Sequence, residues 1–115
     1  MAFDRKNFTN DQLVQFYREL LYPRMIEEKM LILLRQGRIS KWFSGIGQEA
    51  IAVGATLAMQ PDEWIMPLHR NLGVFTTRKM PLSRLFMQWQ GLPGGIVKAA
   101  SAVFILVRKN ILCVV

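Results

Sequence analysis

The chain has 115 residues, a net charge of +7 and hydrophobic residues at 51% of its positions. This length suffices for one small domain, and the apolar fraction excludes a disordered segment. No basic run exceeds two residues and no aromatic side chains alternate with the basic ones, so the positive charge does not indicate a nucleic-acid groove.

The single cysteine, Cys113, and the amino-terminal stretch give information about the cellular compartment of the protein. One cysteine forms no internal disulfide, and the polar start "MAFDRKNFTND" is unlike a secretory signal. The apolar run at 99–107 is shorter than the about 20 residues that a membrane-spanning helix needs. We therefore expect a cytoplasmic protein with neither a membrane nor a nucleic acid as its partner.

The first predicted helix begins at Thr9, whose hydroxyl can cap the amide of Gln12 while the Gln12 side chain reaches back. From Leu13 onward, apolar residues recur at helical spacing. Pro23 is expected to end or kink this helix, or to start a second one. Gly37 is the expected stop of the helical region.

The middle of the chain is predicted to contain a loop, a helix and a short strand. Residues 39–47 include aromatic side chains and two glycines, which is typical of a loop. Residues 48–59 are rich in Ala and Gly, so we expect a buried helix that a neighbouring backbone approaches closely. Residues 62–67, after Pro61, are predicted to form a short strand.

Two further helices are predicted in the second half of the chain. Residues 71–79 form one, with Arg78 and Lys79 at the end where the helix dipole is negative. Pro81 starts the next helix, and Gly91 stops it. The chain is therefore predicted to be mostly α-helical, with one or two short strands and no internal repeat.

His69, the only histidine, and the adjacent Arg70 are the residues that suggest a binding site. They lie where the expected strand meets the start of the helix at 71–79. Free amides at a helix start, together with a guanidinium that can grip two oxygens, suit an anion. A lone histidine is more often a structural residue, so both interpretations stay open on this motif alone.

The remaining polar residues indicate no second kind of site. One histidine and one distant cysteine lack metal-ligand spacing, and a single histidine does not make a Ser-His-Asp arrangement. Glu27 and Glu28 are expected on a solvated face, and Glu49 is expected as an acid at a helix start. We therefore assign no catalytic residue and no metal ligand.

Five stretches of the chain, taken in order, carry a resemblance to a known family: "RQGRIS", "GQEAIAVGA", "PDEWI", "HRNLG" and "PLSRLF". Their order and spacing resemble the amino-terminal part of the α subunit, or fused α half, of the thiamine-diphosphate-dependent E1 component of 2-oxo acid dehydrogenases. The resemblance covers about residues 13–95. It implies the helical start of an α/β thiamine-diphosphate-binding fold, truncated before most of its sheet.

The resemblance also implies roles for individual residues. His69, at a position that is often tyrosine in the family, and Arg70 would hold the cofactor diphosphate, since imidazole can replace phenol as a donor. Asn71 stands where the family frequently has an acidic residue. Phe43 and Leu68 match positions that face the substrate, and their apolar character fits an aliphatic 2-oxo acid. A branched-chain acid is favoured, with pyruvate or acetoin next.

The implied activity is oxidative decarboxylation of a 2-oxo acid with acyl transfer to a lipoyl group. The implied partners are the β subunit or β half, which shares the cofactor, and a lipoyl-bearing acyltransferase. In the family the magnesium ligands and most of the cofactor domain lie beyond the part matched here, so we expect the chain as written to be inactive. A non-enzymatic helical interaction module is the alternative.

Residues 96–115 depart from the family pattern, because acids vanish and aliphatic residues dominate. One permitted codon choice from Val97, read from its third nucleotide, encodes Lys-Gly-Arg-Lys-Arg-Ser-Phe-His-Phe-Gly-Thr-Gln-Glu. This shifted string is the continuation that the family would show. We therefore expect residues 1–95 to be the amino-terminal helical part of the family domain and residues 96–115 to be an out-of-frame tail.

Overall fold

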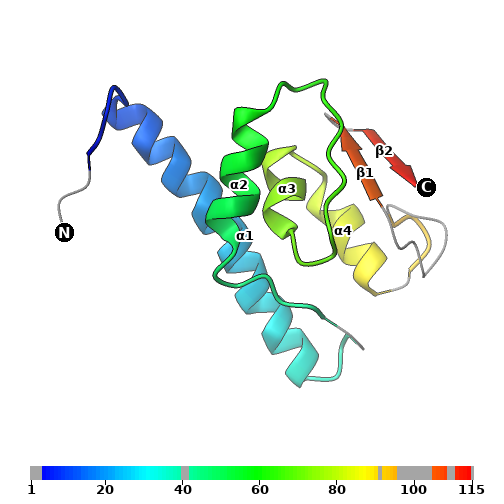
Figure 1. Cartoon of the computed structure of the whole chain (residues 1–115). Coiled ribbons are helices and arrows are strands. Elements are labelled where there is room, and N and C mark those ends of the chain that lie inside the picture. Colours follow the sequence, from blue (N-terminus) through cyan, green and yellow to red (C-terminus); the bar gives the residue numbers. More distant parts are fainter. Residues whose placement is uncertain (1–3, 40–41, 91, 96–104, 109–110, 115) are drawn as a thin grey trace.

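The computed structural model describes residues 4–39, 42–90, 92–95, 105–108 and 111–114. Most of the described residues are helical, which confirms the predicted fold class of this part of the chain. The elements are α1 (Asn10–Arg35), α2 (Glu49–Ala58), α3 (Leu72–Thr77), α4 (Leu82–Trp89), β1 (Ile105–Arg108) and β2 (Ile111–Val114) (Figure 1).

Helix α1 begins and ends at the predicted local signals. The hydroxyl of Thr9 accepts from the amide of Gln12 at 3.3 Å, and the Gln12 side chain accepts from the amide of Thr9 at 2.9 Å. At the other end Gly37 has a φ of +68°, and its amide donates to the carbonyl of Leu34 at 3.0 Å. Glycine adopts this left-handed conformation without steric cost, so it ends the helix here.

Pro23 lies inside α1 and neither ends the helix nor starts a second one. Proline has no amide proton to donate to the carbonyl of Glu19, one turn earlier, so one helical hydrogen bond is missing. Pro23 is fully buried, however. The packing of this part of α1 offsets the missing bond. The expectations that Pro23 ends the helix or starts a second one are wrong, and the expected kink stays a prediction.

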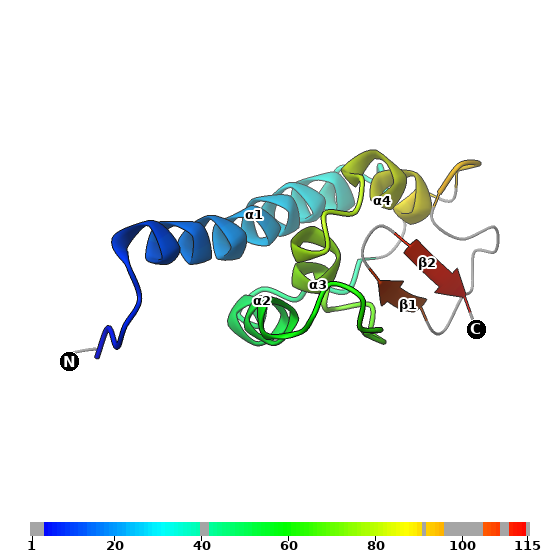
Figure 2. The ribbon, with the colours of Figure 1, turned by 90° about the horizontal axis from the view of Figure 1, so that it is seen from above.

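Helix α3 is the centre of the fold. It packs against both α1 and α2 (Figure 1, Figure 2). Its residues from Leu72 to Thr76 are all buried. Together with the inner faces of the other helices they form one hydrophobic core, whose buried members are Ile26, Met30, Leu33, Ile39, Ala52, Leu72, Val74, Phe75, Met80 and Leu85.

Helix α2 is buried on one face only. On this face a Cβ added to Gly73 of α3 would stand 3.0 Å from the Cβ of Ala52, so the expected close approach of a backbone is confirmed. Val53 and Thr56 are buried on the same face. On the other side Ile51 is 75% exposed, and the prediction of a buried helix is wrong there.

Residues 62–67 do not form the predicted strand, and only Ile65 makes a β-bridge. The buried guanidinium of Arg78 donates to the backbone carbonyls of Gln60 and Glu63, at 3.0 and 3.3 Å. These bonds satisfy carbonyls of the loop that a neighbouring strand would otherwise have to satisfy. Arg78 therefore holds the α2–α3 loop, and it stands at the predicted end of the helix as the C-cap residue of α3.

The two helices of the second half are shorter than predicted. Helix α3 covers only part of the predicted stretch 71–79, and Lys79 forms an ion pair with Glu19 of α1. Pro81 occupies the N-cap position of α4, close to the predicted start. Gly91, the predicted stop, lies outside the described residues.

Strands β1 and β2 form an antiparallel pair in which Ile105 lies opposite Val114 and Arg108 lies opposite Ile111. Both strands fall within the segment 96–115, which we expected from the sequence to be an out-of-frame tail. The other positions of this segment lie outside the described residues. No strand was predicted in this segment.

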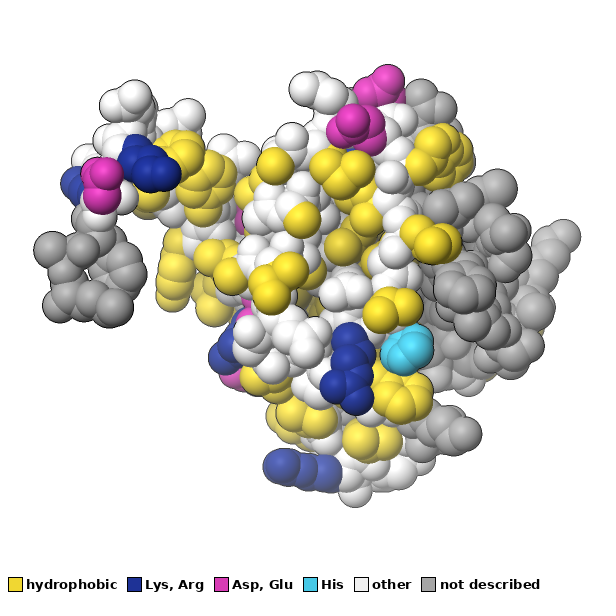
Figure 3. Space-filling model, viewed as in Figure 1, with side chains coloured by type: hydrophobic (Ala, Val, Ile, Leu, Met, Phe, Trp, Pro, Cys, Tyr) yellow, Lys and Arg dark blue, Asp and Glu magenta, His cyan; other side chains and the backbone are white. Residues whose placement is uncertain are grey.

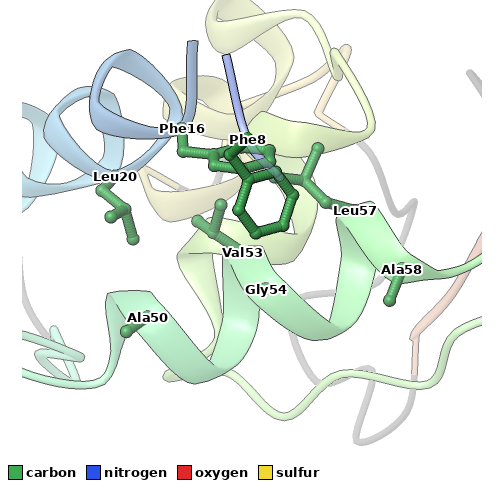
Figure 4. Close-up of a pocket in the computed structure, with 8 residues that line it drawn as sticks. All are labelled: Phe8, Phe16, Leu20, Ala50, Val53, Gly54, Leu57 and Ala58. Carbon is green, nitrogen blue, oxygen red and sulfur yellow. The ribbon is translucent and has the colours of Figure 1, made fainter. Parts of the chain in front are cut away.

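A groove of about 400 Å³ lies between the first half of α1 and helix α2 (Figure 4). It contains none of the predicted site residues and no charged side chain. Its lining consists of Phe8, Phe16, Leu20, Ala50, Val53, Gly54, Leu57 and Ala58. Among the described residues, no helix is both long enough and apolar enough to cross a membrane.

Candidate functional site

His69 and Arg70 lie in the turn that leads into α3. The amide of Asn71 donates to the carbonyl of Leu68 at 3.0 Å, and the amide of Leu68 donates to the side-chain oxygen of Asn71 at 2.9 Å. Because these two bonds close the turn, the two residues between them display exposed side chains. An aspartate carboxylate could accept the same bond, so the departure from the family at Asn71 leaves the turn intact.

The ring of Phe43 packs against the imidazole of His69. Their centroids are 4.8 Å apart and the ring planes are inclined by 50°. Phe43 lies in the loop between α1 and α2, so the structure brings together site residues from two separate segments. Figure 3 shows the imidazole at the surface, beside basic and hydrophobic side chains.

Glu27 of α1 holds the loop that carries Phe43. Its side chain is 1% exposed, and its two oxygens accept from the indole N–H of Trp42 at 2.8 Å and from the amide of Gly45 at 3.0 Å. The prediction of a solvated face is therefore wrong for Glu27, because the carboxylate is needed inside as an acceptor. Helical spacing from buried Met30, three residues later, was the available signal.

Gly45 lies against the backbone of Arg70. A Cβ at Gly45 would stand 2.1 Å from the carbonyl oxygen of Arg70. Only glycine lets the loop approach the turn so closely, and this approach helps to set Phe43 beside His69. The sequence places this glycine in a loop, but no local pattern in it indicates the contact with Arg70.

Arg70 carries an exposed guanidinium for which the described part of the chain offers no hydrogen-bond or ion-pair partner. Leu68, in the same turn, is 58% exposed. A planar guanidinium next to an imidazole suits two or more oxygens of one anion. Helix α3 has only six residues, so the attraction rests on these side chains rather than on the helix dipole.

An ion pair fixes the start of α2 next to this turn. The guanidinium of Arg24 donates to both oxygens of Glu49, at 2.6 and 3.0 Å, and Glu49 also accepts from the amide of Gly47 at 2.9 Å. The hydrogen bond from Arg24 is the main cause that lowers the pKa of Glu49 below its usual value. Glu49 is an acid in the first turn, as predicted, and sequence analysis missed its partner.

The arrangement can bind an anion beside an apolar wall. Glu27 and Glu49, which with Arg70 border one small enclosed space, already accept the hydrogen bonds described above. Among the described residues no three His, Cys, Asp or Glu side chains are grouped so that they could hold a metal ion.

Comparison with known proteins gives a consistent family. A family model described as "Dehydrogenase E1 component" matches residues 17–112. The 2-oxoisovalerate dehydrogenase subunit alpha of Bacillus subtilis is 36% identical over 93 residues, which are 80% of this chain and 26% of that protein. The pyruvate dehydrogenase E1 component subunit alpha of Acholeplasma laidlawii is 32% identical over 88 residues, 76% of this chain and 26% of that protein. No solved structure matches the chain.

The chain belongs to the dehydrogenase E1 component family. Within it, the chain is similar to α subunits of dehydrogenases named for pyruvate and for branched-chain 2-oxo acids. It spans about a quarter of the length of the curated relatives that it matches. The expectation drawn from the five sequence stretches is thus confirmed at the level of the family.

Proposed function

We propose that this chain is the amino-terminal part of the α component of a thiamine-diphosphate-dependent 2-oxo acid dehydrogenase, and that it anchors the cofactor diphosphate. The complete protein would decarboxylate a 2-oxo acid oxidatively and transfer the acyl group to a lipoyl group. When bound, thiamine diphosphate supplies the nucleophilic carbon for this reaction. Membership of the family and the position of the chain in its relatives support the proposal.

The observation that carries the proposal is the exposed pair of His69 and Arg70 in one closed turn. The Arg70 guanidinium can donate two parallel hydrogen bonds to one phosphate group, and the imidazole of His69 can donate a third. Phe43 limits the rotation of the imidazole, since the two rings are in contact. The donor types therefore fit a diphosphate. The magnesium that accompanies it would need ligands beyond this part of the family sequence.

The proposed substrate is a branched-chain 2-oxo acid, with pyruvate or acetoin as the competing substrates. Phe43 and Leu68 are 50% and 58% exposed and would form an apolar wall beside the anion that His69 and Arg70 are proposed to bind. Relatives named for 2-oxoisovalerate are 34% and 36% identical to the chain. In the complete enzyme, Leu68→Ala is expected to lower kcat/KM for the branched-chain acid more than for pyruvate. Equal losses for both acids would refute the role of Leu68 in this choice.

The proposed partners are the β subunit or β half of the same E1 component and a lipoyl-bearing acyltransferase, in the cytoplasm. The chain alone is expected to be inactive. Two phosphate-binding side chains cannot offset the several kcal/mol needed to order a whole cofactor. Decarboxylation of a 2-oxo acid by the isolated chain would contradict this expectation.

Residues 96–115 are proposed to be an out-of-frame tail. The support is the shifted reading from Val97, which gives a family-like continuation. The match of the family model, which extends to residue 112, counts against the proposal. Sequencing the gene through and beyond the stop codon tests the proposal. The expected result is a single-nucleotide change that restores the family sequence downstream. An intact frame with no such continuation in any other frame rules the proposal out.

Arginine modification tests the proposed function on the chain as it exists. Phenylglyoxal labels exposed arginines, and inorganic pyrophosphate is expected to protect Arg70 while leaving Arg84 reactive. Arg84 is a suitable control because it is also exposed. Equal labelling of Arg70 with and without pyrophosphate contradicts the proposal. It would favour the alternative, a helical interaction module that uses the apolar groove between α1 and α2 (Figure 4).

A further inference from the structure

We propose that Glu27 is a positioning residue for the anion site: its buried carboxylate holds residues 42–45 so that Phe43 meets His69. This inference rests on the proposed function of His69 and Arg70. It adds a residue that does not itself touch the ligand.

Burying the carboxylate of Glu27 inside the protein costs free energy. Its side chain is 1% exposed and lies next to Ile26, a member of the hydrophobic core. A carboxylate loses favourable hydration when it is buried, whereas an aliphatic side chain of similar volume gains stability there. The advantage of a glutamate at this position must therefore come from the hydrogen bonds that its oxygens accept.

The hydrogen bonds to Glu27 come from the loop that carries Phe43. Their donors, the indole of Trp42 and the amide of Gly45, stand on either side of Phe43 in the loop. Trp42 is also held from the far side, because its ring packs edge-to-face on Trp89 of α4 with a centroid distance of 4.7 Å. The backbone that carries Phe43 is thus fixed at both ends by a single carboxylate.

The loop that Glu27 holds also contacts the turn that carries His69 and Arg70. The Cβ that is missing at Gly45 would lie 2.1 Å from the carbonyl oxygen of Arg70 and 3.3 Å from an oxygen of Glu27. Gly45 therefore packs between the side chain of Glu27 and the backbone of Arg70. A loop released by Glu27 would move away from the turn, and the contact between Phe43 and His69 would open.

Nuclear magnetic resonance on the full chain tests this inference. Glu27→Gln keeps the shape but replaces one acceptor by an amide donor, and Glu27→Leu removes both acceptors. Glu28→Gln is the matched control, because Glu28 is the exposed neighbour on the same helix. His69 gives unambiguous ring-proton signals since it is the only histidine. Trp42 is followed by hydrogen exchange of its indole N–H.

The expected result is graded. In Glu27→Leu the ring-proton shift that Phe43 imposes on His69 is lost, and the Trp42 indole exchanges about tenfold faster or more. Pyrophosphate binding weakens about fivefold, because the donors are no longer preorganised. Glu27→Gln shows smaller changes in the same direction, and Glu28→Gln shows none. Trp42→Phe, which removes one donor without adding a buried polar group, is expected to open the same ring contact if Glu27→Leu does not fold.

Two outcomes overturn the inference. One is an unchanged contact between Phe43 and His69 in folded Glu27→Gln or Trp42→Phe protein. The other is pyrophosphate binding that is equally strong in the wild-type and variant chains. In that case the anion site of the proposed function is retained, but Glu27 does not position it. If instead wild-type protein does not bind pyrophosphate while the variants still open the ring contact, the proposed function fails and Glu27 remains the residue that positions Phe43.

Discussion

The carbonyl oxygen of Arg70 lies directly against Gly45, where a Cβ would be only 2.1 Å away. Replacing Gly45 with alanine is therefore expected to force the loop and the turn apart. Because backbone atoms have to move, the free energy of unfolding should fall by about 2–3 kcal/mol. Urea unfolding followed by tryptophan fluorescence measures this change.

Gly54→Ala is the matched control for that substitution. Gly54 lies in α2, and a Cβ there would meet nothing within 4 Å. Alanine favours a helix over glycine, so this variant is expected to gain about 0.5–1 kcal/mol. If both variants lose the same stability, the close contact between Gly45 and Arg70 is not the reason.

Arg78 is expected to contribute to stability through the loop between α2 and α3. Arg78→Met keeps much of the buried volume but removes the guanidinium donors from the carbonyls of Gln60 and Glu63; the carbonyl of Gln60 keeps its bond from the amide of Glu63 at 3.2 Å. The loss of these two hydrogen bonds should lower the free energy of unfolding by about 1–3 kcal/mol. Arg84→Met, at an exposed position of α4, should stay within about 0.5 kcal/mol of the wild type. Equal losses in the two variants would argue against the role of Arg78.

The ion pair between Arg24 and Glu49 predicts a particular dependence of stability on pH. The pKa of Glu49 is lowered from its usual value of 4.5 in the folded protein, chiefly by the hydrogen bond from Arg24. The unfolded chain therefore binds the proton more readily, so the pair stabilises the fold above about pH 4.5 and loses this effect as the pH falls through the lower, folded pKa.

Glu49→Gln tests this dependence by unfolding at a series of pH values. At pH 7 the variant is expected to be less stable by about 1 kcal/mol, because the pair is partly exposed and its net contribution is modest. The difference should shrink below pH 4.5. A difference that stays constant down to pH 3 would show that the charge of Glu49 is not responsible.

Local signals predicted the parts of the fold that local hydrogen bonds determine. The capping box of Thr9 and Gln12 and the left-handed glycine at Gly37 were recognisable because each depends on a few adjacent residues. Pro23 and Glu27 were misjudged because tertiary packing decides their state. A proline is tolerated inside a well-packed helix, and a glutamate is buried where donors from a distant loop meet it.

The residues of the candidate site were named from the sequence and stay a prediction, whereas the contacts that bring them together were not predicted. The adjacency of His69 and Arg70 is visible in the sequence, and the family resemblance added Phe43 and Leu68. The contact between Phe43 and His69 depends on the approach of Gly45 to Arg70, for which no local pattern exists. Long-range contacts of this kind become visible only when the chain is folded.

Titration of the chain with inorganic pyrophosphate, followed by the resonances of His69 and the Arg70 guanidinium, measures whether these two side chains bind a diphosphate. The account predicts saturable shifts at both residues with a Kd of about 1 mM, corresponding to about −4 kcal/mol, as expected for a few hydrogen bonds to one anion. Arg70→Gln should abolish these shifts, and Arg84→Gln should leave them intact. Resonances of His69 and Arg70 that stay unmoved at about 20 mM pyrophosphate, or an Arg70→Gln variant that binds as the wild type does, would contradict the account.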